Sequence, residues 1–153
     1  MSLPIETQFA KLLQRAFETG DLEVKNKILE QKNLSALQEF YDAVLRADVD
    51  SFANRLASDA EMEIFCPQEF RFIKQAQGRD EIKNAVLHNF SMLEDQKTDL
   101  LSVVSQGDDI IVIAREKGVF CNTKENYDVH FMQHLVIYDG LIKYIRQILS
   151  FSE

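Results

Sequence analysis

The hydrophobic period of the chain changes from that of a helix to that of a strand near Thr98. From there, four long stretches have a period of two residues, which is typical of β-strands. They span residues 100–105, 109–117, 126–138 and 141–151. Short turns at Gly107-Asp108 and Asp139-Gly140 join consecutive stretches, and such turns favour antiparallel hairpins. The C-terminal half therefore predicts an antiparallel meander.

The N-terminal half has helical periodicity instead. Residues 5–17 place apolar side chains on one helix face, and a second helix is expected over about 22–31. The pattern restarts after Asn33 and predicts a helix around 37–45 and a shorter one around 49–57, with Asp48 as the capping residue between them. A strand over 60–66 ends at Pro67, and Gly78-Arg79-Asp80 opens a further helix. Helices followed by a meander predict an α+β domain with the helices packed on one sheet face.

A chain of 153 residues fits one domain. We expect a domain over 34–153, preceded by a helical extension over 1–33. The net charge of −8 argues against nucleic acid and anionic membranes as partners, because both require basic patches. No apolar run approaches the roughly 18 residues of a membrane span, and the N-terminus lacks signal-peptide features. Only two cysteines, Cys66 and Cys121, are present, so we expect a reducing, cytoplasmic location.

Four short motifs occur in a fixed order along most of the chain. They are Phe40-Tyr41-Asp42-Ala43-Val44-Leu45 running into Ala47-Asp48-Val49-Asp50, then Leu56-Ala57-Ser58-Asp59-Ala60-Glu61-Met62, Gly78-Arg79-Asp80-Glu81-Ile82 and Tyr138-Asp139-Gly140-Leu141-Ile142. In this order they resemble the nuclear-transport-factor-2-like superfamily, which includes ketosteroid isomerase, scytalone dehydratase and SnoaL-type polyketide cyclases. The resemblance covers roughly residues 34–151. It implies a cystatin-like α+β roll, in which helices wrap a strongly bent antiparallel sheet into a cone with a pocket in its mouth.

His134 is the candidate catalytic residue. Counting back from the turn at Tyr138-Asp139-Gly140, the resemblance places it where ketosteroid isomerase carries its oxyanion-stabilising carboxyl. An imidazole there can donate a hydrogen bond or shuttle a proton near neutral pH. Its neighbours on the same strand face, Met132 and Val136, are apolar. We therefore expect His134 to point into the cone, and a structural histidine bonded to a neighbouring element is the alternative.

The other candidate ligand-binding residues lie on the same strand face, on the helix that begins the resemblance, or at the exit of the first strand. They are His130, Met132, Val136 and Tyr138, then Phe40 and Tyr41, and finally Phe65, Cys66 and Phe72. The family's helix tyrosine aligns with Phe40, and Tyr41 is one place away. The family's general base falls at Ile64 or Cys66, neither of which is a carboxylate.

We expect neither a metal nor another cofactor. His130 and His134 are four residues apart on a strand, which separates them by ~13 Å along the backbone, too far to chelate one ion together. The chain also contains no His-Glu-x-x-His or Cys-x-x-Cys pattern.

Two functions follow from these features. The first is a SnoaL-like protein that binds a small apolar molecule in an apolar pocket and acts on it as an acid–base isomerase, cyclase or dehydratase through His134. The second is a non-catalytic ligand-binding or dimeric assembly module of the same fold. The sequence leaves open whether the chain is an enzyme.

Proteins of the superfamily commonly dimerise through the open sheet face, and the sequence is suited to this. Stretches 109–117 and 141–151 carry large apolar residues on both faces, and an exposed second face exceeds the apolar patch that a soluble monomer usually shows. We therefore expect a homodimer through the sheet. The competing expectation is that the N-terminal extension covers this face through Phe9, Leu13 and Phe17.

Overall fold

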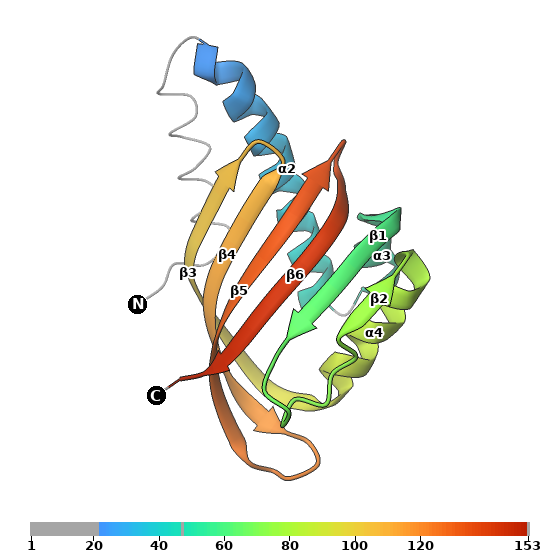
Figure 1. Ribbon diagram of the computed structural model, residues 1–153, viewed down its shortest axis with the longest axis vertical. Coiled ribbons are helices and arrows are strands. Elements are labelled where there is room, and N and C mark those ends of the chain that lie inside the picture. The colour runs from blue at the N-terminus through green and yellow to red at the C-terminus, as the bar shows by residue number, and fades with distance from the viewer. Residues whose placement is uncertain (1–21, 47, 153) are drawn as a thin grey trace.

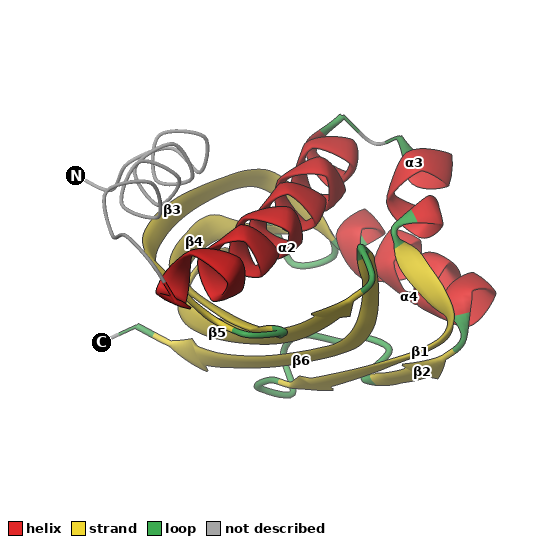
Figure 2. Cartoon of the chain, turned by 90° about the horizontal axis from the view of Figure 1, so that it is seen from above, coloured by secondary structure: helices red, strands yellow, loops and turns green. Residues whose placement is uncertain are grey.

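Six strands form one curved sheet in the order β2-β1-β6-β5-β4-β3, and helix α2 crosses its concave side (Figures 1 and 2). The computed structural model describes residues 22–46 and 48–152. Its elements are α2 (Leu22–Leu45), α3 (Val49–Asn54), β1 (Leu56–Phe65), β2 (Gln75–Gln77), α4 (Arg79–Ser91), β3 (Leu93–Gln106), β4 (Asp109–Phe120), β5 (Asn126–Tyr138) and β6 (Leu141–Phe151). The predicted α+β cone with a strongly bent sheet is confirmed.

Helix α2 is one continuous helix, so the predicted break near Asn33 is wrong. The Asn33 side chain is buried, and its Nδ2 donates a hydrogen bond of 3.1 Å to the carbonyl oxygen of Gly107 in the β3–β4 turn. This contact with the sheet offsets the weak helix propensity of asparagine. The predicted helix over 5–17 lies outside the described residues, and the division into an extension and a domain stays a prediction.

The segment from α3 to β1 follows the predicted capping but turns into a strand earlier. Asp48 caps α3 by accepting hydrogen bonds from the backbone nitrogen of Ser51 (3.2 Å) and from its hydroxyl (2.6 Å). Strand β1 then begins at Leu56, whose carbonyl oxygen accepts two hydrogen bonds from the Arg79 guanidinium of α4. It lies parallel to β6, so one pairing in the sheet is parallel while the others are antiparallel.

The meander has the predicted order, and the bounds of β5 and β6 are those that the alternation predicts. A bulge at Lys143 in β6 shifts the pairing with β5 between Val136 and Ile137. Because the extra residue reverses the alternation, Ile142 and Ile145 are both buried on the same side of the sheet.

The hydrophobic core lies between α2, α3 and the concave side of the sheet, which we call the inner face. Strands β4 and β5 contribute fully buried aliphatic side chains, and the helices contribute Leu37, Phe40 and Phe52. The opposite side of the sheet, the outer face, carries no helix among the described residues (Figure 2). Burial of apolar surface on one face only makes the two sides of each strand chemically different.

An aromatic cluster around Phe70 lies on the inner face near the β4–β5 loop, which follows Phe120 and precedes Tyr127. The Phe70 ring is buried, and its centroid lies 5.2 Å from Phe72, 4.9 Å from Phe120 and 5.2 Å from Tyr127. Tyr127 lies directly over Gly118 of the neighbouring strand, where a Cβ atom would come within 2.5 Å of the tyrosine hydroxyl oxygen. Glycine at position 118 therefore leaves the space that the Tyr127 ring occupies.

We expect Gly118→Ala to destabilise the fold by about 1–3 kcal/mol, because the new methyl group overlaps the ring of Tyr127. Urea unfolding of Gly118→Ala, Tyr127→Leu and the double variant measures this. The double variant should lose less stability than the sum of the single losses, since the overlap is then removed. Wild-type stability of Gly118→Ala, or additive losses, would contradict the close packing.

Candidate functional site

The two faces of β5 hold different sets of side chains. Its buried residues on the inner face are Tyr127, Val129, Gln133, Leu135 and Ile137. His134 belongs to the alternate set, which lies on the outer face. The sequence separated the two sets correctly, but the prediction that His134 points into the cone is wrong.

His134 takes part in a polar network on the outer face. Its Nε2 lies 2.8 Å from Oδ1 of Asp109, and its ring centroid lies 6.2 Å from that of Tyr144. Tyr144 and Arg146 of β6 both donate hydrogen bonds to Glu63 of β1. The Tyr144 bond is the main cause that lowers the pKa of the Glu63 carboxyl. The more apolar of the two sets of β5 side chains lies on the inner face. A comparison of the hydrophobicity of the two sets over residues 126–138 would have predicted this.

Four more predicted ligand-lining residues also lie away from the inner face. Met132, Val136 and Tyr138 share the outer face with His134, and Tyr138 is 61% exposed. Phe65, the last residue of β1, pairs with Ile148 and is 52% exposed on the same side. The prediction that these side chains line the interior of the cone is wrong. For Met132, Val136 and Tyr138 it followed from the same inversion of β5, whereas Phe65 was chosen for its place at the exit of the first strand.

His130, also predicted to bind the ligand, is exposed on the outer face in the first half of β5. Its Nδ1 lies 2.7 Å from the hydroxyl oxygen of Ser152 at the C-terminal end. The same inversion explains this correction.

The remaining predicted residues lie on the core side. Phe40 is buried against Phe52, and Tyr41 packs edge-on against Phe40 at a centroid distance of 5.7 Å. Cys66 and Phe72 are partly buried against the core. Burial raises the pKa of the Cys66 thiol, so this thiol stays protonated at neutral pH and is a poor nucleophile.

Tyr41 meets a residue that the sequence analysis missed. Its hydroxyl donates a hydrogen bond to Oε1 of Gln133 across the interior. Burial raises the pKa of the Tyr41 hydroxyl, which therefore remains a neutral donor. Within the described part of the chain, no acceptor bonds to Nε2 of Gln133, so this amide keeps a donor available.

Gln147 of β6 pairs directly with Gln133 and extends the polar strip on the inner face. Hydropathy alone assigns glutamine to the surface, which is why both amides were missed. The available signal was that each stands alone among the apolar residues of its strand face.

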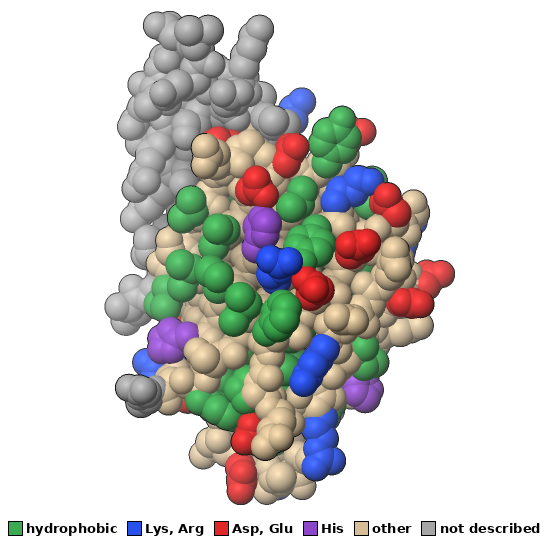
Figure 3. Space-filling view, viewed as in Figure 1, with side chains coloured by type: hydrophobic (Ala, Val, Ile, Leu, Met, Phe, Trp, Pro, Cys, Tyr) green, Lys and Arg blue, Asp and Glu red, His purple; other side chains and the backbone are tan. Residues whose placement is uncertain are grey.

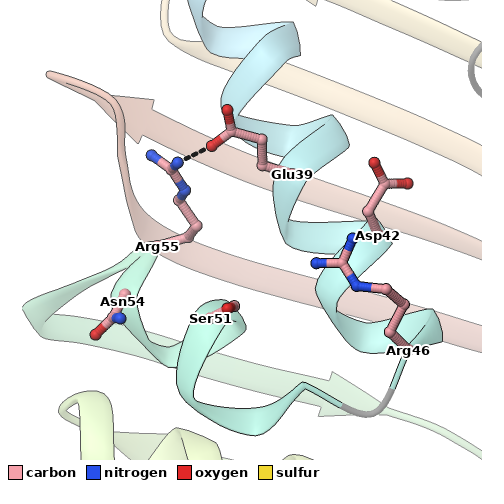
Figure 4. Close-up of a pocket in the computed structure, with 6 residues that line it drawn as sticks. All are labelled: Glu39, Asp42, Arg46, Ser51, Asn54 and Arg55. Carbon is pink, nitrogen blue, oxygen red and sulfur yellow. Dashed lines mark ion pairs between the residues drawn. The ribbon is translucent and has the colours of Figure 1, made fainter.

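A pocket of about 390 Å³ lies elsewhere, between α2 and α3 (Figure 4). Its lining is wholly polar and consists of Glu39, Asp42, Arg46, Ser51, Asn54 and Arg55. An ion pair between Glu39 and Arg55 crosses one side of it. Equal numbers of acidic and basic side chains and the absence of an apolar wall do not match an apolar ligand.

Two further findings concern the described residues only. No three histidine, cysteine or carboxylate side chains among them gather as a metal site would require. None of the helices in the described ranges is long and apolar enough to cross a membrane.

The bent sheet, the helices on its concave side and the polar strip inside define a nuclear-transport-factor-2-like α+β cone. The family model described as the SnoaL-like domain matches residues 37–145, and the chain belongs to this SnoaL-like family. None of the curated proteins matches the chain in sequence.

Solved structures share the fold at low sequence identity. An NTF2-like protein from Burkholderia xenovorans is 18% identical, with a TM-score of 0.67 over 79% of this chain and 91% of that chain. TerC, co-crystallised with polyporic acid, is 16% identical, with a TM-score of 0.64 over 78% and 92%. A protein with a ketosteroid isomerase-like fold from Catenulispora acidiphila, in complex with trimethylamine, is 14% identical, with a TM-score of 0.59 over 73% and 82%. These likenesses show the fold.

The Arg115–Asp128 ion pair on the outer face predicts that the stability of the protein changes at acid pH. Arg115 donates two hydrogen bonds to Asp128, which lower the pKa of this carboxyl from 3.8 to about 2. Because the folded-state pKa is lowered, the stabilisation is present above pH 4 and is lost as the pH falls toward 2. Urea unfolding midpoints of Asp128→Asn should therefore fall less steeply over this window than those of the wild type.

The matched control is Asp139→Asn in the exposed β5–β6 turn, which should keep the wild-type slope. Equal slopes for both variants and the wild type would contradict the role of the Arg115–Asp128 pair.

Proposed function

We propose that this SnoaL-like protein binds a small apolar molecule against the inner face of its sheet, with an oxygen atom of the ligand at Gln133. The observation that carries the proposal is the Tyr41–Gln133 hydrogen bond, which sets a polar pair into an otherwise apolar wall. Few polar groups on an apolar wall are the usual composition of a small-molecule site. The free Nε2 of Gln133 suits a carbonyl or hydroxyl oxygen.

Phe131, two residues before Gln133 on the same face of β5, supports this location, because it packs against the core yet keeps part of its surface accessible. Two structures of the same fold hold small organic molecules, polyporic acid in TerC and trimethylamine in the Catenulispora protein.

Free cysteines at positions 66 and 121 fit the proposed cytoplasmic location.

The proposed activity is binding rather than acid–base catalysis through His134. The sheet separates the His134 imidazole from the inner face, because the two sets of β5 side chains point to opposite sides. Tyr41 stays protonated and the glutamine amides do not titrate, so this strip orients a ligand oxygen without exchanging a proton with it.

We also propose that a second copy of the chain covers the outer face. The register aligns Ile113, Met132, Ile148 and Phe65 in one row across β4, β5, β6 and β1. These side chains are 38%, 40%, 41% and 52% exposed, respectively. Figure 3 shows hydrophobic side chains gathered on this face. A continuous apolar row of this kind favours burial against another surface.

A polar row beside the apolar one fits a two-fold mate. In the neighbouring row, Arg146 lies between His134 and Glu63, and Asp109, which bonds to His134, supplies a second negative charge. In a two-fold interface the same patch meets itself, so Arg146 of one copy can face a carboxylate of the other. The alternative cover, the N-terminal segment with Phe9, Leu13 and Phe17, would leave the full chain monomeric.

Matched biphenyl probes test the ligand proposal. The wild type should bind 4-acetylbiphenyl about fivefold more tightly than 4-ethylbiphenyl, because only the ketone accepts the Gln133 hydrogen bond. Tyr41→Phe/Gln133→Met removes both members of the pair without leaving a buried partner unpaired, and it should bind the two probes equally. Thermal shift and calorimetric titration measure both affinities. Tyr138→Phe on the outer face is the control and should keep the preference. Binding of neither probe to the wild type would contradict the proposal.

Light scattering during size exclusion tests the dimer. The full chain should elute as a dimer, and Met132→Lys/Ile148→Lys should elute as a monomer, because each lysine charge opposes burial in the apolar row. Leu87→Lys on α4 is the control, since Leu87 is equally exposed but lies away from the sheet face. A monomeric wild-type chain, or dissociation by Leu87→Lys as well, would contradict the outer-face interface.

A further inference from the structure

A second polar centre lies on the inner face, at some distance from the Tyr41–Gln133 pair. Tyr127 of β5 donates a hydrogen bond of 2.7 Å to Oε2 of Glu116 on β4. Thr98 of β3 donates one of 3.0 Å to Oε1 of the same carboxylate. Glu116 lies on the inner face because it is two residues away from both Ala114 and Gly118 on β4, which are buried on that side. This is the inner-face carboxylate that the sequence analysis did not identify.

The surroundings of Tyr127 hold its hydroxyl on this carboxylate. Its ring lies over Gly118 and packs against Phe70 and Phe120 at centroid distances of 5.2 and 5.0 Å. Burial, followed by the charge of Glu116, raises the pKa of the Tyr127 hydroxyl, so this group stays a donor. The position of the carboxylate is therefore fixed by a rigid aromatic support.

Glu116 retains capacity for another hydrogen bond. An ionised carboxylate offers about four acceptor positions. Within the described part of the chain, Tyr127 and Thr98 each use one oxygen once. The Glu116 side chain is partly exposed, in contrast to the buried Val129 beside it on β5. A ligand group that meets Glu116 must be a donor, since the carboxylate only accepts.

The register of the sheet sets the separation of the two polar centres. Gln133 pairs with Val112, and Glu116 lies four residues further along β4, which corresponds to roughly 13 Å of strand. The residues between them on the inner face are apolar. Ala114 pairs with Phe131 on one side and with Leu100 on the other. Because the alanine side chain is small, Phe131 and Leu100 provide most of the apolar surface between the two polar centres.

We propose that Glu116 is a second ligand anchor, so that the ligand is an elongated apolar molecule with a hydrogen-bond acceptor at its Gln133 end and a donor, such as a hydroxyl, at its Glu116 end. This rests on the proposed binding function. A polar group at each end of an apolar segment fixes both the length and the direction of the bound molecule.

Two further biphenyl probes test the second anchor. In 4-acetyl-4′-hydroxybiphenyl the far end carries a donor, and in 4-acetyl-4′-methoxybiphenyl the donor is blocked. The wild type should bind the hydroxyl probe about tenfold more tightly than the methoxy probe, as expected for a hydrogen bond to a charged acceptor. Isothermal calorimetry on the full chain gives both dissociation constants.

The variant Glu116→Met/Tyr127→Phe removes the carboxylate together with its buried donor. It should bind both probes with the affinity of the methoxy probe, while it keeps the preference for 4-acetylbiphenyl over 4-ethylbiphenyl. Glu116→Met alone should give the same ligand result if the double variant folds poorly. Glu125→Met in the exposed β4–β5 loop is the control and should keep the tenfold preference.

The outcomes separate this inference from the proposed function. Equal binding of the hydroxyl and methoxy probes to the wild type, with the ketone preference intact, overturns the second anchor only. A hydroxyl preference that survives in both Glu116 variants also overturns it. Loss of the ketone preference, or binding of no probe, overturns the proposed function and the second anchor together.

Discussion

The packing of α2 against one side of the sheet decides the chemistry of both sides. Each strand of the meander carries two alternating sets of side chains, and burying one set under the helix leaves the other outside. Leu37 and Phe40 of α2 pack against the inner face, and in doing so they place Tyr41 opposite Gln133. A slip of one residue in β5 would exchange these sets and bring His134 inside. The proposed ligand wall and the proposed association surface therefore depend on the same contact.

The polar groups on the inner face differ in kind from those on the outer face. Inside, few of them are present, and each is held by a specific partner, as in the Tyr41–Gln133 and Tyr127–Glu116 pairs. Outside, Asp109, His134 and Arg146 take part in an exposed network in which water competes for the charges. An isolated polar group in an apolar wall discriminates between ligands, because its desolvation is offset only by a matching partner. This contrast is the physical basis for assigning recognition to the inner face and association to the outer face.

The SnoaL-like fold itself does not define the ligand. The similar structures share the cone at 14–18% identity, and a fold of this kind can carry different chemistries on one scaffold. In this chain an aromatic cluster around Phe70 packs against the inner face. The specific features are the amides of Gln133 and Gln147 and the carboxylate of Glu116, which lie on three neighbouring strands. Their spacing comes from the strand register, which therefore sets the length of the proposed ligand.

The sequence by itself determined the order of the meander strands, the bounds of β5 and β6, the Asp48 cap and the separation of the β5 side chains into two sets. These are local properties, because turn residues, caps and hydrophobic period act over a few neighbouring positions. Only the tertiary structure decided which set of β5 faces the helices, that α2 continues through Asn33, and that the Lys143 bulge places Ile142 and Ile145 on one side. Period-two alternation is identical for both orientations of a strand. The choice between them is made by the total apolar area that the whole sheet buries against α2, and this sum cannot be read from the neighbours of one histidine.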